Sequence, residues 1–197
     1  MVIVILTSFV LYPRGRKTEV QSTFVSLIHL GSWAANYGAQ LWVILVAGLT
    51  MFYSLPRHIF GKVQSHLFPM FFLWSLVTSS VQLGTFVLQH PMESWQTFHT
   101  VEVAILTSSF LAAATNSVIL APLIVKSMVH TFRLEVEARV SDVIGYAAIK
   151  EMKNDPEYIA ARRMFRRCHG LSALLTVVGL VSNSIHLYYL SCQCVRI

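Results

Sequence analysis

The order of apolar and polar residues divides the chain into four long uncharged stretches joined by charged segments. No Asp, Glu, Lys or Arg occurs in residues 20–56, 63–92, 103–125 and 168–195. About 20 apolar residues in a helix cross the hydrocarbon core of a bilayer. Apolar and polar residues do not alternate with period two, which argues against a membrane barrel. The pattern predicts an all-α membrane protein, a four-span transmembrane helical bundle with spans near 24–54, 67–89, 98–125 and 168–192.

The remaining segments complete a single membrane domain over residues 20–197, preceded by a short apolar segment and basic link at 1–19. Residues 1–12 would extend only about 18 Å as a helix, which is too short to span. The basic cluster follows this apolar run, whereas in a signal peptide the basic residues come first. We therefore expect the N-terminal segment to lie at the interface or to be re-entrant.

Residues 126–167 are expected to form a cytosolic helical hairpin between spans three and four. Asn154-Asp155-Pro156-Glu157 is a helix start, with Asp155 as the cap and Pro156 at the first helical position. Before it, apolar residues at intervals of three and four predict an amphipathic helix that continues the third span: Val125, Val129, Phe132, Val136, Val140, Val143 and Ala147.

Composition and charge agree with a membrane protein and suggest its orientation. Apolar residues make up 55% of the chain and charged residues only 12%, where globular domains have about a quarter charged. The net charge is +6, and eleven of the fifteen Lys and Arg residues lie in 54–66 and 126–167. Because basic loops stay in the cytosol, both termini are expected in the lumen or outside the cell.

Polar residues recur on one face of the first predicted span, where His29, Trp33, Asn36 and Gln40 are spaced by four, three and four. The other spans add four more: Gln82, Asn116, Asn183 and His186. Polar groups at membrane depth face protein or water. The favoured interpretation is hydrogen bonding between helices, and the alternative is the wall of a cavity for a lipid headgroup or a solute. Glu102 alone supplies a carboxylate near a span, which gives little support to an ion-coupled transporter.

Basic residues form a second candidate surface, on the predicted cytosolic side. They anchor topology, and they also suit anionic lipid headgroups or an acidic partner. The residues are Arg57, Lys62, Arg162, Arg163, Arg166 and Arg167.

The usual signs of catalysis are missing from the sequence. It has no nucleophile beside an evident base, no histidine pair at metal-ligand spacing, no glycine-rich phosphate loop and no paired carboxylates in the spans. We therefore expect no enzymatic activity, no metal and no cofactor, with phospholipid as the expected ligand. Cys192 and Cys194 are interpreted as free or lipidated thiols, with a soft-metal pair as the alternative.

Four runs of residues are similar to one known family: 54–65 (SLPRHIFGKVQS), 67–69 (LFP), 155–158 (DPEY) and 169–172 (HGLS). On these runs the chain resembles the transmembrane protein 205 family from about His29 to Asn183. It departs from the family at Ala121-Pro122, where relatives often have a glutamate before the proline. The motif residues are Leu55, Pro56, Arg57, Gly61, Pro69, His169 and Gly170.

The resemblance implies a small four-span protein of the secretory pathway or cell surface, linked to platinum-drug resistance and to lipid-transfer machinery. The expected function is a non-enzymatic accessory subunit that anchors a larger membrane protein complex. It would support lipid transfer from the endoplasmic reticulum at a membrane contact site, with membrane lipids and a bridge-like lipid-transfer protein as partners and no nucleic acid. The plasma membrane is the second choice of location. Two alternatives remain, a solute or drug transporter and a membrane enzyme acting on lipid.

Overall fold

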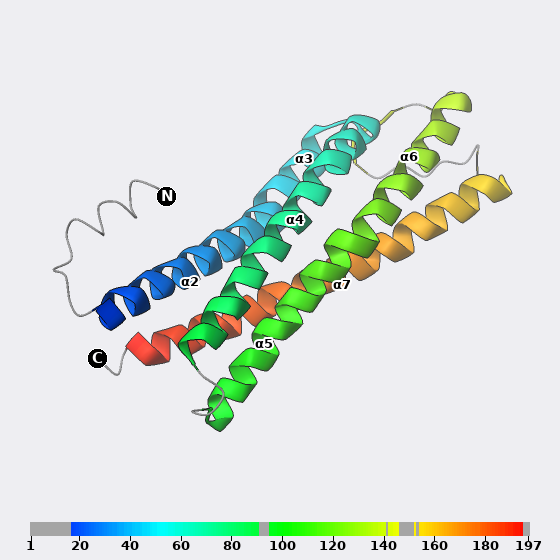
Figure 1. Cartoon of the computed structure of the whole chain (residues 1–197). Helices are drawn as coiled ribbons and strands as arrows, with labels where there is room; N and C mark the ends of the chain where they lie inside the picture. The colour runs from blue at the N-terminus through cyan, green and yellow to red at the C-terminus, as the bar shows by residue number, and fades with distance from the viewer. Residues whose placement is uncertain (1–16, 91–94, 141, 146–151, 153, 195–197) are drawn as a thin grey trace.

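The fold is a bundle of long helices, described here from a computed structural model that covers residues 17–90, 95–140, 142–145, 152 and 154–194 (Figure 1). The first rod is continuous and comprises α2 (Lys17–Leu41), the π-helical segment η1 (Trp42–Ala47) and α3 (Gly48–Ser54). The second is α4 (Arg57–Gln89). The third comprises α5 (Thr97–Ala114), the π-helical segment η3 (Thr115–Leu120) and α6 (Ala121–Glu137), and the fourth is α7 (Pro156–Cys194).

The four rods are the predicted spans. Each contains a helix long and apolar enough to cross a membrane: Thr23–Ser54, Arg57–Gln89, Thr97–Glu137 and Pro156–Cys192. α2 packs on α4, α4 on α5, and α7 on both α5 and α6. The start of α2, the end of α4, the start of α5 and the end of α7 lie together at one end of the bundle (Figure 1). We call this the α4–α5 end, and the opposite end, where α3 ends and α7 begins, the Glu135 end.

Many polar residues lie in the interior of the bundle beside apolar ones, and apolar residues cover its outside. Asn36, Gln82 and His186 are completely buried, whereas Trp42, Leu88, Val118 and Tyr188 are more than half exposed. In water this arrangement would be unstable, but in lipid the outer apolar surface is solvated and the polar groups find partners between helices. The chain is therefore a multi-pass membrane protein, as the sequence predicted.

The π-helical segment η3 lies directly before Pro122. A proline has no N–H to donate to the carbonyl four residues earlier, and its ring collides with that carbonyl. In η3 the helix is wider, and the N–H of Ala121 bonds to the carbonyl of Asn116, five residues back. The widened turn lets the third rod pass the proline without ending.

The third rod stops ten residues earlier than predicted, at Glu137. Arg139 adopts the left-handed conformation, with φ of 55°. The N–H of Val140 then bonds to the Glu135 carbonyl, and that of Arg139 to the Val136 carbonyl. This is a Schellman motif, in which Leu134 and Val140 pack on Met152 and Tyr158. The prediction of a helix to Ala147 was wrong, because an arginine holds the position where glycine would mark the end.

The buried face of α6 also differs from the predicted apolar face. Val129 and Val136 are 53% and 63% exposed. The buried residues include Ile124, Thr131 and Glu135, so α6 turns polar groups toward the bundle and valines outward. An outward apolar face is the expected arrangement for a helix in contact with lipid.

The starts of α7 and α4 differ in how well the local sequence predicted them. Asp155 caps α7, because its carboxylate accepts the N–H groups of Glu157 and Tyr158, which confirms the predicted start. α4 begins at Arg57, directly after Pro56, although 55–61 contains the helix-breaking residues Pro56 and Gly61 and the sequence pattern therefore favours a turn there; Gly61 lies inside the helix. The N-terminal segment 1–12 and the end of the predicted hairpin helix near Ala147 lie outside the described residues.

Candidate functional site

A buried carboxylate joins three helices at the Glu135 end. Glu135 of α6 has no exposed surface, and both of its oxygens bond to the guanidinium of Arg57, at the start of α4. His58 Nε2 lies 2.8 Å from the second oxygen, and the Tyr158 hydroxyl of α7 donates to the first at 2.8 Å. A buried ion pair is stable only when further hydrogen bonds satisfy it, and here two neighbouring side chains complete the set.

The start of α4 is fixed by the segment that follows α6. The Arg57 N–H bonds to the Val143 carbonyl at 3.0 Å, and the His58 N–H to an Asp142 carboxylate oxygen at 3.0 Å. The first N–H groups of a helix have no partner within it, and Pro56 offers no side chain that could cap them. The loop therefore caps α4 from a distance and aligns Arg57 with Glu135.

Tyr158 connects this ion pair to the basic helix α7. Arg162 lies one turn further along α7 and donates to the Tyr158 hydroxyl oxygen at 3.1 Å. The hydroxyl thus donates to Glu135 while it accepts from Arg162.

We expect Tyr158→Phe to lower the free energy of unfolding by about 1.5 kcal/mol, because a hydrogen bond to a charged group is lost and Glu135 stays buried. Unfolding in detergent micelles measures this. Tyr188→Phe is the matched control, since Tyr188 lies on the same helix and is 71% exposed. Equal effects of the two substitutions would contradict the assigned role of the Tyr158 hydroxyl.

A cavity of about 550 Å³ lies beside Glu135, between α3, α4, α6 and α7. Arg57, Glu135, Arg162 and Arg166 form its charged part. Its other walls are mostly apolar: Leu49, Phe52, Leu55, Phe60, Phe68, Met128, Phe132 and Phe165. Leu49, Phe52 and Arg166 are exposed at its rim, so the cavity is open to the surroundings. The combination of a basic part and apolar walls is amphipathic.

Two polar groups in the cavity wall retain hydrogen-bonding capacity. Gln64 is 4% exposed, and its Oε1 has no partner among the described residues. The Arg57 Nε, which is not used by Glu135, is likewise buried and unpaired within the part of the chain that the structure describes. An unpaired buried donor or acceptor costs free energy that a bound polar ligand could recover.

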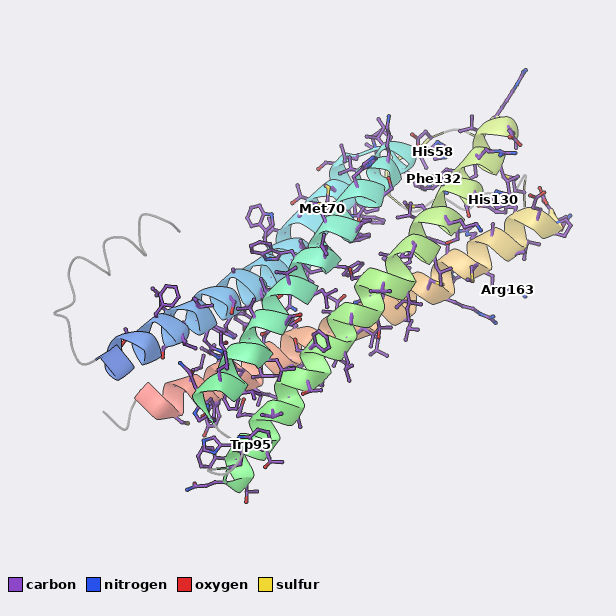
Figure 2. The ribbon with its side chains drawn as sticks, in the orientation of Figure 1. His58, Met70, Trp95, His130, Phe132 and Arg163 are labelled. Atoms are coloured by element: carbon purple, nitrogen blue, oxygen red, sulfur yellow. The ribbon has the colours of Figure 1, made fainter. Side chains whose placement is uncertain are left out.

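The motif residues of the resemblance gather at this cavity. Leu55, Arg57, Gly61 and His169 all line it, although His169 is on a different helix from the others. At Gly61 a β-carbon would overlap the ring of Phe132, so the glycine allows close contact between α4 and α6. Figure 2 shows His58 and Phe132 side by side there, with ring centroids 5.0 Å apart. Pro56 precedes α4 and Pro69 lies inside it. At Gly170 an added β-carbon would contact no side chain and no backbone of another segment within 4 Å.

The predicted basic surface divides into two groups. Arg57, Arg162 and Arg166 line the cavity, and Arg163 and Arg167 do not. Lys62, Arg163 and Arg167 are exposed, and Figure 2 places Arg163 on the side of α7 that faces away from α6. These arginines had the same expected role, and the rotation of α7 about its axis separates them into two groups.

The predicted polar stripe lies inside the bundle and reaches several helices. Asn183 Nδ2 donates to Gln40 Oε1 at 3.1 Å, and the Trp33 indole donates to the Asn183 carbonyl. Asn116 instead donates to the Ser172 carbonyl and the Thr176 hydroxyl of α7. The amide atoms of Asn36 and Gln82 have no partner among the described residues. A cavity of about 10 Å³, lined in part by Asn36, Gln40 and Asn116, has the size of one water molecule.

Sequence reasoning missed a buried chain of titratable groups at the α4–α5 end. His186 lies between Glu102 and His29: its Nδ1 is 3.0 Å from Glu102 Oε2, and its Nε2 is 2.8 Å from His29 Nε2. His29 Nδ1 is 2.8 Å from the Thr85 hydroxyl. From the sequence, His29 and His186 belong to the polar residues of the spans and Glu102 stands apart from them, and no signal in the sequence joins residue 102 to the two histidines. In the described part of the chain, no group of three or more His, Cys, Asp or Glu is placed to hold a metal ion.

Comparisons with known proteins identify relatives by sequence. The family profile described as "Domain of unknown function (DUF4149)" matches residues 31–132, just over half of the chain. Transmembrane protein 205 of Danio rerio is 28% identical over 173 residues, which cover 85% of this chain and 92% of that protein. No solved structure matches the chain.

Proposed function

The chain belongs to the DUF4149 family of transmembrane protein 205-like membrane proteins, and from this premise we propose that it binds a phospholipid in the cavity at the Glu135 end. In this proposal it acts without catalysis, as an accessory subunit that supports lipid transfer from the endoplasmic reticulum. The amphipathic lining of the cavity is the observation that carries the proposal.

The charged part of the cavity suits a phosphate group. Glu135 neutralises one side of the Arg57 guanidinium, and Nε remains as a free donor. Arg162 and Arg166 add two further guanidinium groups, which bind phosphate oxygens in a planar, forked geometry. A bound phosphate would therefore meet more positive charge than Glu135 balances.

The apolar part of the cavity suits acyl chains. Phe52 and Leu49 of α3 lie at the rim, and Phe68 of α4 lies deeper against Phe72 and His169. Because α3 lies in the predicted first span, acyl chains could leave the cavity directly into the bilayer. This favours a lipid over a water-soluble anion as the ligand.

A solute transporter is the weaker candidate. That alternative requires a path along His29, Asn36, Gln40 and Asn116, and the space beside the last three measures only about 10 Å³. A volume of that size fits a water molecule and no drug-sized solute.

The lipid proposal predicts that Arg162→Gln/Arg166→Gln lowers the phospholipid retained per protein several-fold after gentle detergent extraction. The loss is expected because two of the three cavity arginines no longer bind phosphate. Mass spectrometry of the extracted lipid measures the ratio and identifies the headgroup.

Arg163→Gln/Arg167→Gln is the matched control, because it removes the same charge from the same helix outside the cavity lining. Its lipid content is expected to equal that of the wild type. Equal losses in both variants would mean that α7 attracts lipid only through its overall charge, and the cavity would then have no role.

The accessory-subunit part of the proposal has its own test. Purification of the tagged chain from its native membrane is expected to recover a large partner in a fixed ratio, and localisation of the same tag is expected in the endoplasmic reticulum. A chain recovered alone, with phospholipid still bound, would reject the subunit role and leave the lipid site intact.

A further inference from the structure

The hydrogen bonds of the Glu102, His186 and His29 chain determine how many protons it holds. Thr85 Oγ1 is 2.6 Å from the Val81 carbonyl and 3.1 Å from the Gln82 carbonyl, and both can only accept, so the single hydroxyl proton is donated to the backbone of α4. His29 Nδ1 must therefore donate to Thr85. The bonds between His29 and His186 and between His186 and Glu102 each need one proton as well. Three hydrogen bonds thus require three protons on these three side chains.

Three protons make the unit electrically neutral as a whole. Two neutral imidazoles and one neutral carboxylic acid carry the same number. Moving the proton from Glu102 to His186 Nδ1 gives a carboxylate and an imidazolium, with no change in the total charge. A fourth proton would leave a net positive charge between the helices, and loss of the third would leave a net negative charge. Either net charge is costly at membrane depth.

The three side chains of Glu102, His186 and His29 are buried, so the charge of this group depends mainly on the protons that its own members hold. His29 and His186 are 4% and 0% exposed, and Glu102 is 5% exposed. The other titratable groups nearby are Tyr189 of α7, which stacks on His186, and two histidines in ring contact with Phe86: His90, directly after α4, and His99 of α5. Phe86 separates His90 from His186, with ring centroids 4.5 and 6.3 Å from its own. No described Lys or Arg forms an ion pair with Glu102.

A titratable side chain, His99, lies between Glu102 and the α4–α5 end of the bundle in the order of residues along α5. His99 precedes Glu102 by three residues on α5, so the two side chains share one helix face. His99 is half-buried and lies in the first turn of α5. Its Nδ1 accepts the Gln96 N–H, which leaves Nε2 to carry the ring proton. Glu102 is thus one side chain away from the end of the bundle.

We propose that Glu102, His186 and His29 form a proton-binding site that takes up one proton when the bundle folds and exchanges it with water at the α4–α5 end. This inference is independent of the proposed lipid site, which lies at the opposite end of the bundle. The ligand is the proton itself, and the site ties α2, α4, α5 and α7 together only while that proton is present.

Proton counting gives the sign of the pH dependence. Above about pH 7 an unfolded chain has an ionised Glu102 and two neutral histidines, which hold two protons in total. The folded unit holds three, so unfolding releases one proton and stability falls as pH rises. Below about pH 6 the unfolded histidines become charged and the unfolded chain holds more protons than the folded one. Stability then falls with falling pH.

Glu102→Gln provides a sharp test, because the amide can donate to His186 Nδ1 and preserve all three hydrogen bonds. The variant should fold, and its unfolding should release no proton near pH 8, where the wild type releases about one. Folding stability in micelles, measured from pH 6 to pH 9, gives the number of protons from its slope. Glu137→Gln, on the exposed surface, should retain the wild-type slope.

Three outcomes would overturn the proposal: equal slopes for wild type and Glu102→Gln, a Glu102→Gln chain that does not fold, or a wild-type slope of zero. Nitrogen NMR of labelled histidines in the wild-type chain adds a measurement that needs no variant. It should find the Nδ1 of His29 protonated from pH 6 to pH 9. A His29 without a proton on Nδ1 would contradict the hydrogen-bond count directly.

Discussion

Glu135→Ala is expected to lower the free energy of unfolding by about 3 to 5 kcal/mol, the cost of leaving one partner of a buried ion pair alone. Arg57 would keep its charge on a side chain that is only 17% exposed, and it would have lost its counter-ion. Tyr158 and His58 would lose an acceptor at the same time. Denaturation in micelles, at several detergent compositions, measures the loss.

The control for this prediction is two residues away on the same helix. Glu137 pairs with Arg133 at 2.9 Å, and both side chains are more than half exposed. Exposed pairs four residues apart contribute about 0.3 to 0.5 kcal/mol, so Glu137→Ala should have almost no effect. If Glu135→Ala cost as little, the buried network would not stabilise the Glu135 end.

Gly61→Ala is expected to cost about 3 kcal/mol, the upper part of the range for overpacking. The new β-carbon would overlap the ring of Phe132. That ring cannot move freely, because it packs beside His58 and lies 5.9 Å from the Arg57 guanidinium carbon. Relief of the overlap would therefore disturb the Glu135 ion pair as well.

Two further variants make this prediction specific. Gly84 lies on the same helix, and a β-carbon added there would meet no side chain within 4 Å, so Gly84→Ala should be neutral or stabilising by about 0.5 to 1 kcal/mol. Phe132→Ala should recover part of the loss caused by Gly61→Ala, because it removes the atoms that overlap. A Gly61→Ala chain as stable as the wild type would mean that α4 and α6 are not in close contact.

Both ends of the bundle use the same physical solution for polar groups at membrane depth. At the Glu135 end a full charge is balanced by another charge, Arg57, and by two further hydrogen bonds. At the α4–α5 end a carboxyl group is balanced by a shared proton and two histidines. The two ends therefore hold their carboxyl groups by different means, an ion pair at one end and a proton shared with histidine at the other.

The sequence by itself determined the class of protein and its long helices. Uncharged stretches of this length can satisfy their backbone in lipid only as helices, so four spans followed from composition and spacing. The start of α7 was also predictable, because Asp155 bonds to N–H groups only two and three residues away. The family resemblance selected Arg57, Gly61 and His169, without a physical reason for them.

Only the tertiary structure decided which polar residues form sites. Glu135 bonds to residues 78, 77 and 23 positions away, and His186 to residues 84 and 157 positions away. Such pairs depend on how each helix is rotated about its axis and shifted along it. Apolar residues that face lipid do not determine this rotation or shift. The end of α6 at Glu137 could not be predicted from the sequence for a related reason. Arg139 has the left-handed backbone conformation because Leu134 and Val140 pack on Met152 and Tyr158, and this contact joins segments that are distant in the sequence.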